Sequence, residues 1–125
     1  MGGATHHKTS MSQELANAWV ANQQAAIDHF FMGNHALYMA FKTACLGQFP
    51  RDVQAIESAL QSRDDEALRR AAHNLKGALN MLGCKSQAHA ALQLELAACA
   101  GEAQAIELAK HRLLADLQDF LTRPD

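Results

Sequence analysis

Hydrophobic positions along this chain recur every three or four residues, which is the spacing of one face of an α-helix. The pattern predicts a first helix that starts near Ser10 or Ser12. Later segments are predicted from His35 to Leu60, Asp65 to Leu82, Ser86 to Cys99 and Ala103 to Leu121. The connections between them are short, so successive helices should be antiparallel neighbours in an up-down bundle.

Capping and helix-breaking residues separate the predicted helices. Asn34 suits an N-cap, and Ser62 to Asp65 combines capping residues with first-turn acids. Ser86 is expected to cap the fourth helix. Gly83 and Gly101 supply helix stops. Pro50 interrupts the second pattern, which predicts either one helix kinked there or two helices that meet there.

Composition supports an all-α class. The chain of 125 residues has 25 Ala and 16 Leu but only 9 residues of Val, Ile and Thr together. Ala and Leu favour helices, whereas β-branched residues favour strands. The polar residues 1–10 read as a disordered leader, which leaves residues 11–125 as a single domain.

Charge and cysteine content exclude several classes of protein. Eleven basic and 13 acidic residues give no basic footprint for nucleic acid. No apolar run is long enough for membrane insertion, and no secretory signal is visible. The three cysteines have no paired spacing, which indicates reduced thiols. We therefore expect a cytoplasmic protein. We also expect a monomer, and no metal site of its own, because no ligand pair with helical i, i+4 spacing is visible among the histidines and cysteines.

The helix from Asp65 to Leu82 carries the candidate chemistry. Its apolar stripe is spaced 4, 3, 4 and 3 and consists of Leu68, Ala72, Leu75, Leu79 and Leu82. Its polar cluster lies roughly 130° around the helix from that stripe and consists of Arg69, His73, Lys76, Gly77 and Asn80. His73 is therefore expected to face solvent. A mid-helix glycine costs about 1 kcal/mol relative to alanine, so Gly77 suggests a bare patch where another surface can approach His73.

The run from Ala71 to Gly83 resembles the signature of the histidine-containing phosphotransfer (HPt) domain family. That signature has His, then Lys-Gly three and four residues later, then Gly ten residues later, and here these are His73, Lys76, Gly77 and Gly83. Leu94-Glu95 on the following helix, the Phe49-Pro50 step and the acidic start at Asp64 also fit the family. The resemblance covers residues 34–121.

The resemblance implies a four-helix bundle with an additional N-terminal helix. It implies that His73 is phosphorylated, on Nε2, by a receiver-domain phospho-aspartate and passes the phosphoryl group to the receiver of another response regulator. Lys76 would pair with the phosphoryl oxygens, Asn80 would donate a hydrogen bond, and Gly77 would permit close docking. Partner-binding residues would be Arg69, Arg70 and Gly83.

The sequence shows no phosphate-binding loop or ATP lid, so we expect a phosphocarrier rather than an enzyme. It carries no cofactor in this reading, and Mg²⁺ is expected on the partner receiver. A sensor or hybrid histidine kinase is the expected upstream partner. Two arrangements fit the chain: a stand-alone carrier, which the start at Met1 favours, or a C-terminal module of such a kinase. Two alternatives stay open: a helical module that docks receivers without phosphotransfer, and the substrate domain of a chemotaxis-type kinase.

Overall fold

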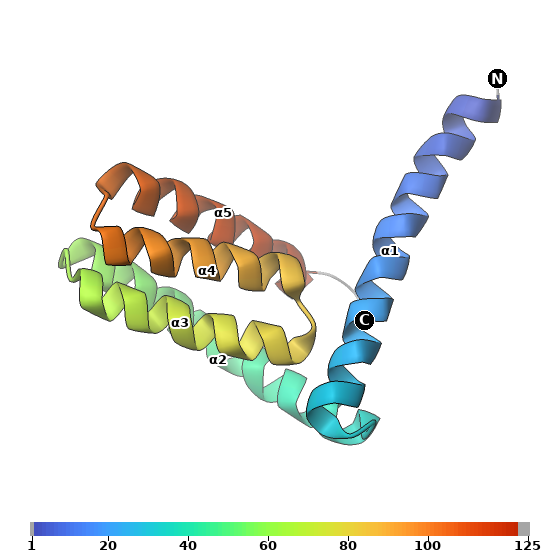
Figure 1. Ribbon diagram of the computed structural model, residues 1–125, viewed down its shortest axis with the longest axis horizontal. Helices are drawn as coiled ribbons and strands as arrows, with labels where there is room; N and C mark the ends of the chain where they lie inside the picture. The colour runs from blue at the N-terminus through green and yellow to red at the C-terminus, as the bar shows by residue number, and fades with distance from the viewer. Residues whose placement is uncertain (1, 123–125) are drawn as a thin grey trace.

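The computed structural model contains five helices over the residues it describes, which are 2–122 for the backbone and 17–120 for the side chains (Figure 1). They are α1 (Gly2–Phe31), α2 (His35–Gln61), α3 (Asp65–Leu82), α4 (Lys85–Ala100) and α5 (Ala103–Thr122). Helices α2 to α5 form an up-down bundle, and α1 crosses one end of it and leans away (Figure 1). The all-α class and the additional N-terminal helix are thus confirmed.

Most of the predicted helix boundaries coincide with local capping interactions. Asn34 Oδ1 accepts a hydrogen bond from the Leu37 amide at 3.0 Å, and Asp64 Oδ1 accepts one from the Ala67 amide at 3.0 Å. Each bond satisfies an amide that lacks a partner within its own helix. Helix α4 differs from the prediction, because it begins one residue before Ser86, with Cys84 at the N-cap and no side-chain cap.

Helix α2 runs without interruption through Pro50, so the single-helix alternative is the one observed. Proline lacks an amide and removes one helical hydrogen bond. Pro50 is exposed, so water can solvate the carbonyl that it leaves without a partner. The flanking turns are held by Phe49 and Ile56, both 0% exposed in the core.

The core is built around the apolar stripe of α3. Its five predicted members are all buried: Leu68, Ala72, Leu75, Leu79 and Leu82. Alanines on the facing side of α4 let its backbone come close to α3, and Leu94 fills the remaining space between them. Leu113 and Leu117 of α5 and the Phe49–Phe120 ring contact complete the core. Burial of this stripe fixes the rotation of α3, and thereby decides which of its side chains face outward.

Only the C-terminal part of α1 is seen to pack on the bundle. Ala26, Ile27 and Phe31 are buried, and Trp19 makes an edge contact with Phe120 at 5.8 Å between ring centroids. The backbone from Gly2 onward is helical, so α1 begins earlier than the predicted start near Ser10 or Ser12. No proline interrupts residues 2–31, so the helix anchored by the packed residues continues toward the N-terminus. The boundary between residues 1–10 and 11–125 stays a prediction.

Buried contacts join the end of α3 to α1 and α2. The Tyr38 hydroxyl donates a hydrogen bond to the Leu82 carbonyl at 2.7 Å. Gly83 ends α3 with a left-handed φ of 80°, and a Cβ there would lie 2.5 Å from the Asn22 carbonyl oxygen of α1. Gly83 therefore serves both as a helix stop and as the point where two backbones touch.

Among the described residues, no helix is long and apolar enough to cross a membrane.

Replacing Gly83 with Ala is expected to destabilise the protein by about 1–3 kcal/mol, because the left-handed φ and the clash with α1 add together. Chemical denaturation of both proteins measures this difference. The same substitution at Gly101, which also has a positive φ but only a side-chain neighbour at 3.5 Å, is the control and should cost less. Equal losses at the two glycines would contradict the proposed contact with α1.

Candidate functional site

His73 lies on the outer surface of α3, as the helical pattern predicted. Its side chain is 57% exposed, although it lies between Ala72 and Leu75 of the buried stripe in sequence. The exposure follows from the 100° turn per residue, which places His73 off the buried face. A histidine in this position is accessible to another protein.

A carboxylate from α4 links the two central side chains of the predicted site. Glu95 Oε2 lies 2.9 Å from His73 Nδ1, and Glu95 Oε1 accepts a hydrogen bond from Lys76 Nζ at 2.8 Å. The Glu95 side chain is only 13% exposed, so water competes weakly for these contacts. His73, Lys76 and Glu95 form what we call the His73 triad.

The ionisation of Glu95 sets the proton position on His73. The hydrogen bond from Lys76, followed by that from His73, holds the pKa of Glu95 below its ordinary value, although desolvation opposes them. An ionised carboxylate can only accept hydrogen bonds, so His73 Nδ1 must be the donor. In the neutral imidazole the lone pair then belongs to Nε2, the nitrogen that does not contact Glu95. This is the arrangement of an oriented nucleophile.

The remaining predicted residues of the cluster extend the site along α3. Asn80 shares a groove of about 290 Å³ with Lys76, Lys85 and His89, where α3 meets the start of α4. Gly77 is exposed, and a Cβ built on it would meet nothing within 4 Å. Packing inside the chain therefore does not require glycine at this position.

The predicted partner-binding residues have different surroundings. Arg69 donates hydrogen bonds to Glu66 at 2.7 and 3.1 Å, which raises the pKa of Arg69 and offsets part of its charge. Arg70 is more exposed, with only a 4.0 Å approach to Glu66. The prediction that Gly83 binds a partner is corrected by the structure. Gly83 is buried against α1, so its role is structural.

Glu95 is the residue that the sequence reasoning did not assign to the site. Leu94-Glu95 was visible as a pair typical of the family, but no spacing rule connects Glu95 with a histidine 22 residues earlier. The antiparallel packing of α3 and α4 makes that connection. Among the described side chains, no group of three or more His, Cys, Asp or Glu is placed to hold a metal ion.

The fold and the triad define a class of protein: a helical bundle that presents an oriented, accessible histidine on one helix. Comparison with family models identifies it further. The Hpt domain model matches residues 41–123, and the chain belongs to this family. Comparisons with curated proteins and with solved structures gave no match. Hpt domains are phosphocarrier modules of phosphorelays that generally interact with receiver domains and kinases, so the family implies a histidine phosphotransfer role.

Replacing Lys76 with Met removes the largest cause of the lowered pKa of Glu95. We expect the pKa of Glu95 to rise toward its ordinary value, as measured by a ¹³C NMR titration of its carboxyl group. Lys110→Met is the matched control, since Lys110 pairs with Glu107 on α5 and leaves the triad intact. A Glu95 titration unchanged by Lys76→Met would contradict the bridging geometry.

The same variant has a pH signature in stability. Because the pKa of Glu95 is lowered by folding, its ionised form stabilises the fold at pH values above the ordinary glutamate range. That contribution is lost as the pH falls through the lowered pKa. The free energy of unfolding should therefore depend less on pH on the acid side in Lys76→Met than in the original protein.

Proposed function

We propose that His73 accepts a phosphoryl group from the phospho-aspartate of a receiver domain and passes it to the aspartate of another response regulator. The observation that carries this proposal is the contact between His73 Nδ1 and Glu95, because it leaves Nε2 as the nucleophile. The family supports the general role, and the geometry supports the particular residue and nitrogen. The expected donor upstream is a receiver associated with a sensor or hybrid histidine kinase.

The proposed step needs no external base. The Nε2 lone pair forms a bond to phosphorus while the bond from phosphorus to the aspartyl oxygen breaks, and that electron pair returns to the carboxylate. The imidazole becomes positively charged because Nδ1 keeps its proton. Glu95, ionised and 2.9 Å from Nδ1, stabilises this charge. Transfer to the second receiver is the reverse reaction at a different aspartate.

Lys76 is proposed to bind the transferred group. Its ammonium lies 2.8 Å from Glu95 and its side chain is 24% exposed, so it can turn toward phosphoryl oxygens that arrive at Nε2. Phosphoryl transfer proceeds through a loose transition state whose charge is spread over those oxygens, and a nearby cation stabilises it. Asn80, one turn farther along, is proposed as an amide donor to the same oxygens.

The docking surface is proposed to include the bare backbone at Gly77 and the cation of Arg70. A receiver must bring its aspartate to within bonding distance of Nε2, and the missing side chain at Gly77 leaves room for that approach. The proposal places the aspartate and the Mg²⁺ ion on the receiver. Arg69, already paired with Glu66, would contribute less to attraction than Arg70.

Phosphotransfer is tested by mixing the protein with a labelled phospho-receiver and Mg²⁺. Label that is acid-labile and base-stable is expected on the original protein and absent from His73→Gln. His111→Gln is the matched control, because His111 is also exposed but lies on α5, which contributes no residue to the His73 triad. It should accept label at the original rate.

The outcomes of this test separate the candidate functions. Equal label on the original protein and on His73→Gln would place the phosphoryl group elsewhere and remove the proposal. If no receiver transfers label although binding is still detected, the chain is a docking module. In that case the surface around the His73 triad would serve recognition alone.

Replacing Gly77 with Ala is expected to change stability and transfer in opposite directions. Alanine in a helix interior is favoured over glycine by roughly 0.5–1 kcal/mol, and nothing in the chain would clash with it. Transfer from a receiver should nonetheless slow, because the added methyl group obstructs docking. Gly47→Ala is the control, since Gly47 is also helical, exposed and uncrowded, and it should stabilise without slowing transfer. Unchanged transfer in Gly77→Ala would remove Gly77 from the docking surface.

A further inference from the structure

A groove adjoins the His73 triad where α3 meets the start of α4, and we call it the α3–α4 groove. Its volume is about 290 Å³, and none of the residues that line it is acidic: Lys76, Asn80, Lys85, Ala88, His89 and Leu92. Ala88 is buried and Leu92 is half-buried, so the groove has an apolar floor, with Lys85 and His89 exposed beside it. Lys76 belongs to both the groove and the triad, so the two surfaces are continuous.

The polar side chains at the rim of this groove have no partner of their own. In the part of the chain that the structure describes, neither the Lys85 nor the His89 side chain makes a hydrogen bond or an ion pair. The carboxylates of the two helices lie elsewhere, since Asp65 and Glu66 are in the first turn of α3 and Glu95 is in the triad. The positive charge of Lys85 is therefore not neutralised by any acidic side chain of α3 or α4.

The position of Lys85 is unfavourable for its own helix. Lys85 is the first residue of α4, which has no acidic residue in its first turn. The positive end of a helix dipole repels a cation, whereas it attracts acids such as Asp65 and Glu66 at the start of α3. The stability of α4 thus does not explain Lys85. An acidic group from another molecule would relieve the repulsion.

Distances along the helix place the α3–α4 groove beneath a protein that docks at His73. Lys85 precedes Glu95, the triad residue of α4, by ten residues and His89 precedes it by six, which correspond to about 15 Å and about 9 Å along the axis. Each partner in a standard interface buries about 800 Å², and a round patch of that area has a radius of about 16 Å. A receiver centred on His73 therefore covers His89 and reaches Lys85 at its rim.

We propose that the α3–α4 groove determines which receivers dock, by binding an acidic side chain that lies about 10–15 Å from the phosphorylated aspartate of the receiver. The carboxylate pairs with Lys85 and accepts a hydrogen bond from His89, and its aliphatic part lies on Ala88 and Leu92. This inference rests on the proposed phosphotransfer function and names the feature that distinguishes one receiver from another. Lys85 cannot reach a phosphoryl group on His73, so it contributes to docking and not to the chemical step.

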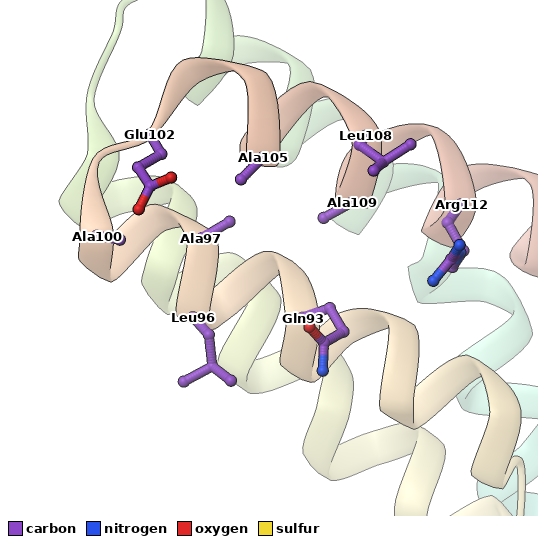
Figure 2. Close-up of a pocket in the computed structure, with 9 residues that line it drawn as sticks. All are labelled: Gln93, Leu96, Ala97, Ala100, Glu102, Ala105, Leu108, Ala109 and Arg112. Carbon is purple, nitrogen blue, oxygen red and sulfur yellow. The ribbon is translucent and has the colours of Figure 1, made fainter.

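A second groove on α4 provides the control for charge. It lies between α4 and α5, has a volume of about 310 Å³, and is lined by no residue of α3 (Figure 2). Arg112 of α5 lines this second groove and is exposed. Arg112→Glu changes the net charge of the protein by the same amount as Lys85→Glu, but it does so away from the His73 triad and the α3–α4 groove.

The test measures binding and phosphotransfer separately, with a panel of receivers and Mg²⁺. For a receiver that transfers label to His73, Lys85→Glu should weaken binding and raise KM about fivefold, with the rate at saturation unchanged. His89→Ala should act in the same direction. The affinity of the original protein should fall more steeply with salt than that of Lys85→Glu. Arg112→Glu should keep the original KM and binding.

Loss of binding in Lys85→Glu is not expected to come from unfolding. Lys85 is exposed, and glutamate at the first position of α4 interacts favourably with the helix dipole. Thermal denaturation should therefore show that the variant is at least as stable as the original protein. A variant that is stabilised yet docks poorly is the signature of a residue retained for binding.

The outcomes separate this inference from the proposed function. Equal KM and equal binding for Lys85→Glu and Arg112→Glu would overturn the role of the groove and leave phosphotransfer on His73 intact. A Lys85→Glu variant that binds normally but transfers slowly at saturation would overturn it too. If no receiver transfers label but Lys85→Glu still weakens binding, the proposed function fails and the groove remains a receiver-binding site. Absence of binding to every receiver would overturn both.

Discussion

The packing of α3 against α4 is the interaction on which both the fold and the chemistry depend. The leucine stripe of α3 can be buried in only one rotation of the helix, and that rotation turns His73 outward. The alanines of α4 allow the two backbones to come close, which brings the Glu95 carboxylate within 2.9 Å of the imidazole. One apolar contact therefore establishes the core and positions the candidate nucleophile at the same time.

A single carboxylate then gives the site its polarity. One oxygen of Glu95 keeps a proton on Nδ1 of His73, and the other accepts a hydrogen bond from Lys76. A phosphoryl group at Nε2 would therefore have the ammonium group of Lys76 nearby. This arrangement depends on limited exposure of the carboxylate, since water would otherwise weaken both contacts. The histidine itself remains open, because a phosphocarrier must exchange partners. Partial burial of the carboxylate and exposure of the ring are compatible because they come from different helices.

Helix α4 separates two surfaces with different properties. Its side toward α3 carries Glu95 and the polar groove with Asn80, where charged and amide groups converge. Its side toward α5 is lined by small and apolar side chains with charges only at the ends. The first surface is thus polar and carries the His73 triad, whereas the second is mainly apolar.

The sequence by itself determined the helices, their caps at Asn34 and Asp64, the buried stripe of α3 and the outward position of His73. Each of these depends on residues within a few turns of one another, so a periodic pattern contains them. Only the tertiary structure decided the partner of His73, because Glu95 comes from another helix. It also decided that Gly83 supports α1 rather than a partner, since its neighbour Asn22 lies 61 residues earlier in the chain. Contacts between distant segments depend on how whole helices pack, and helix packing cannot be predicted from a local sequence pattern.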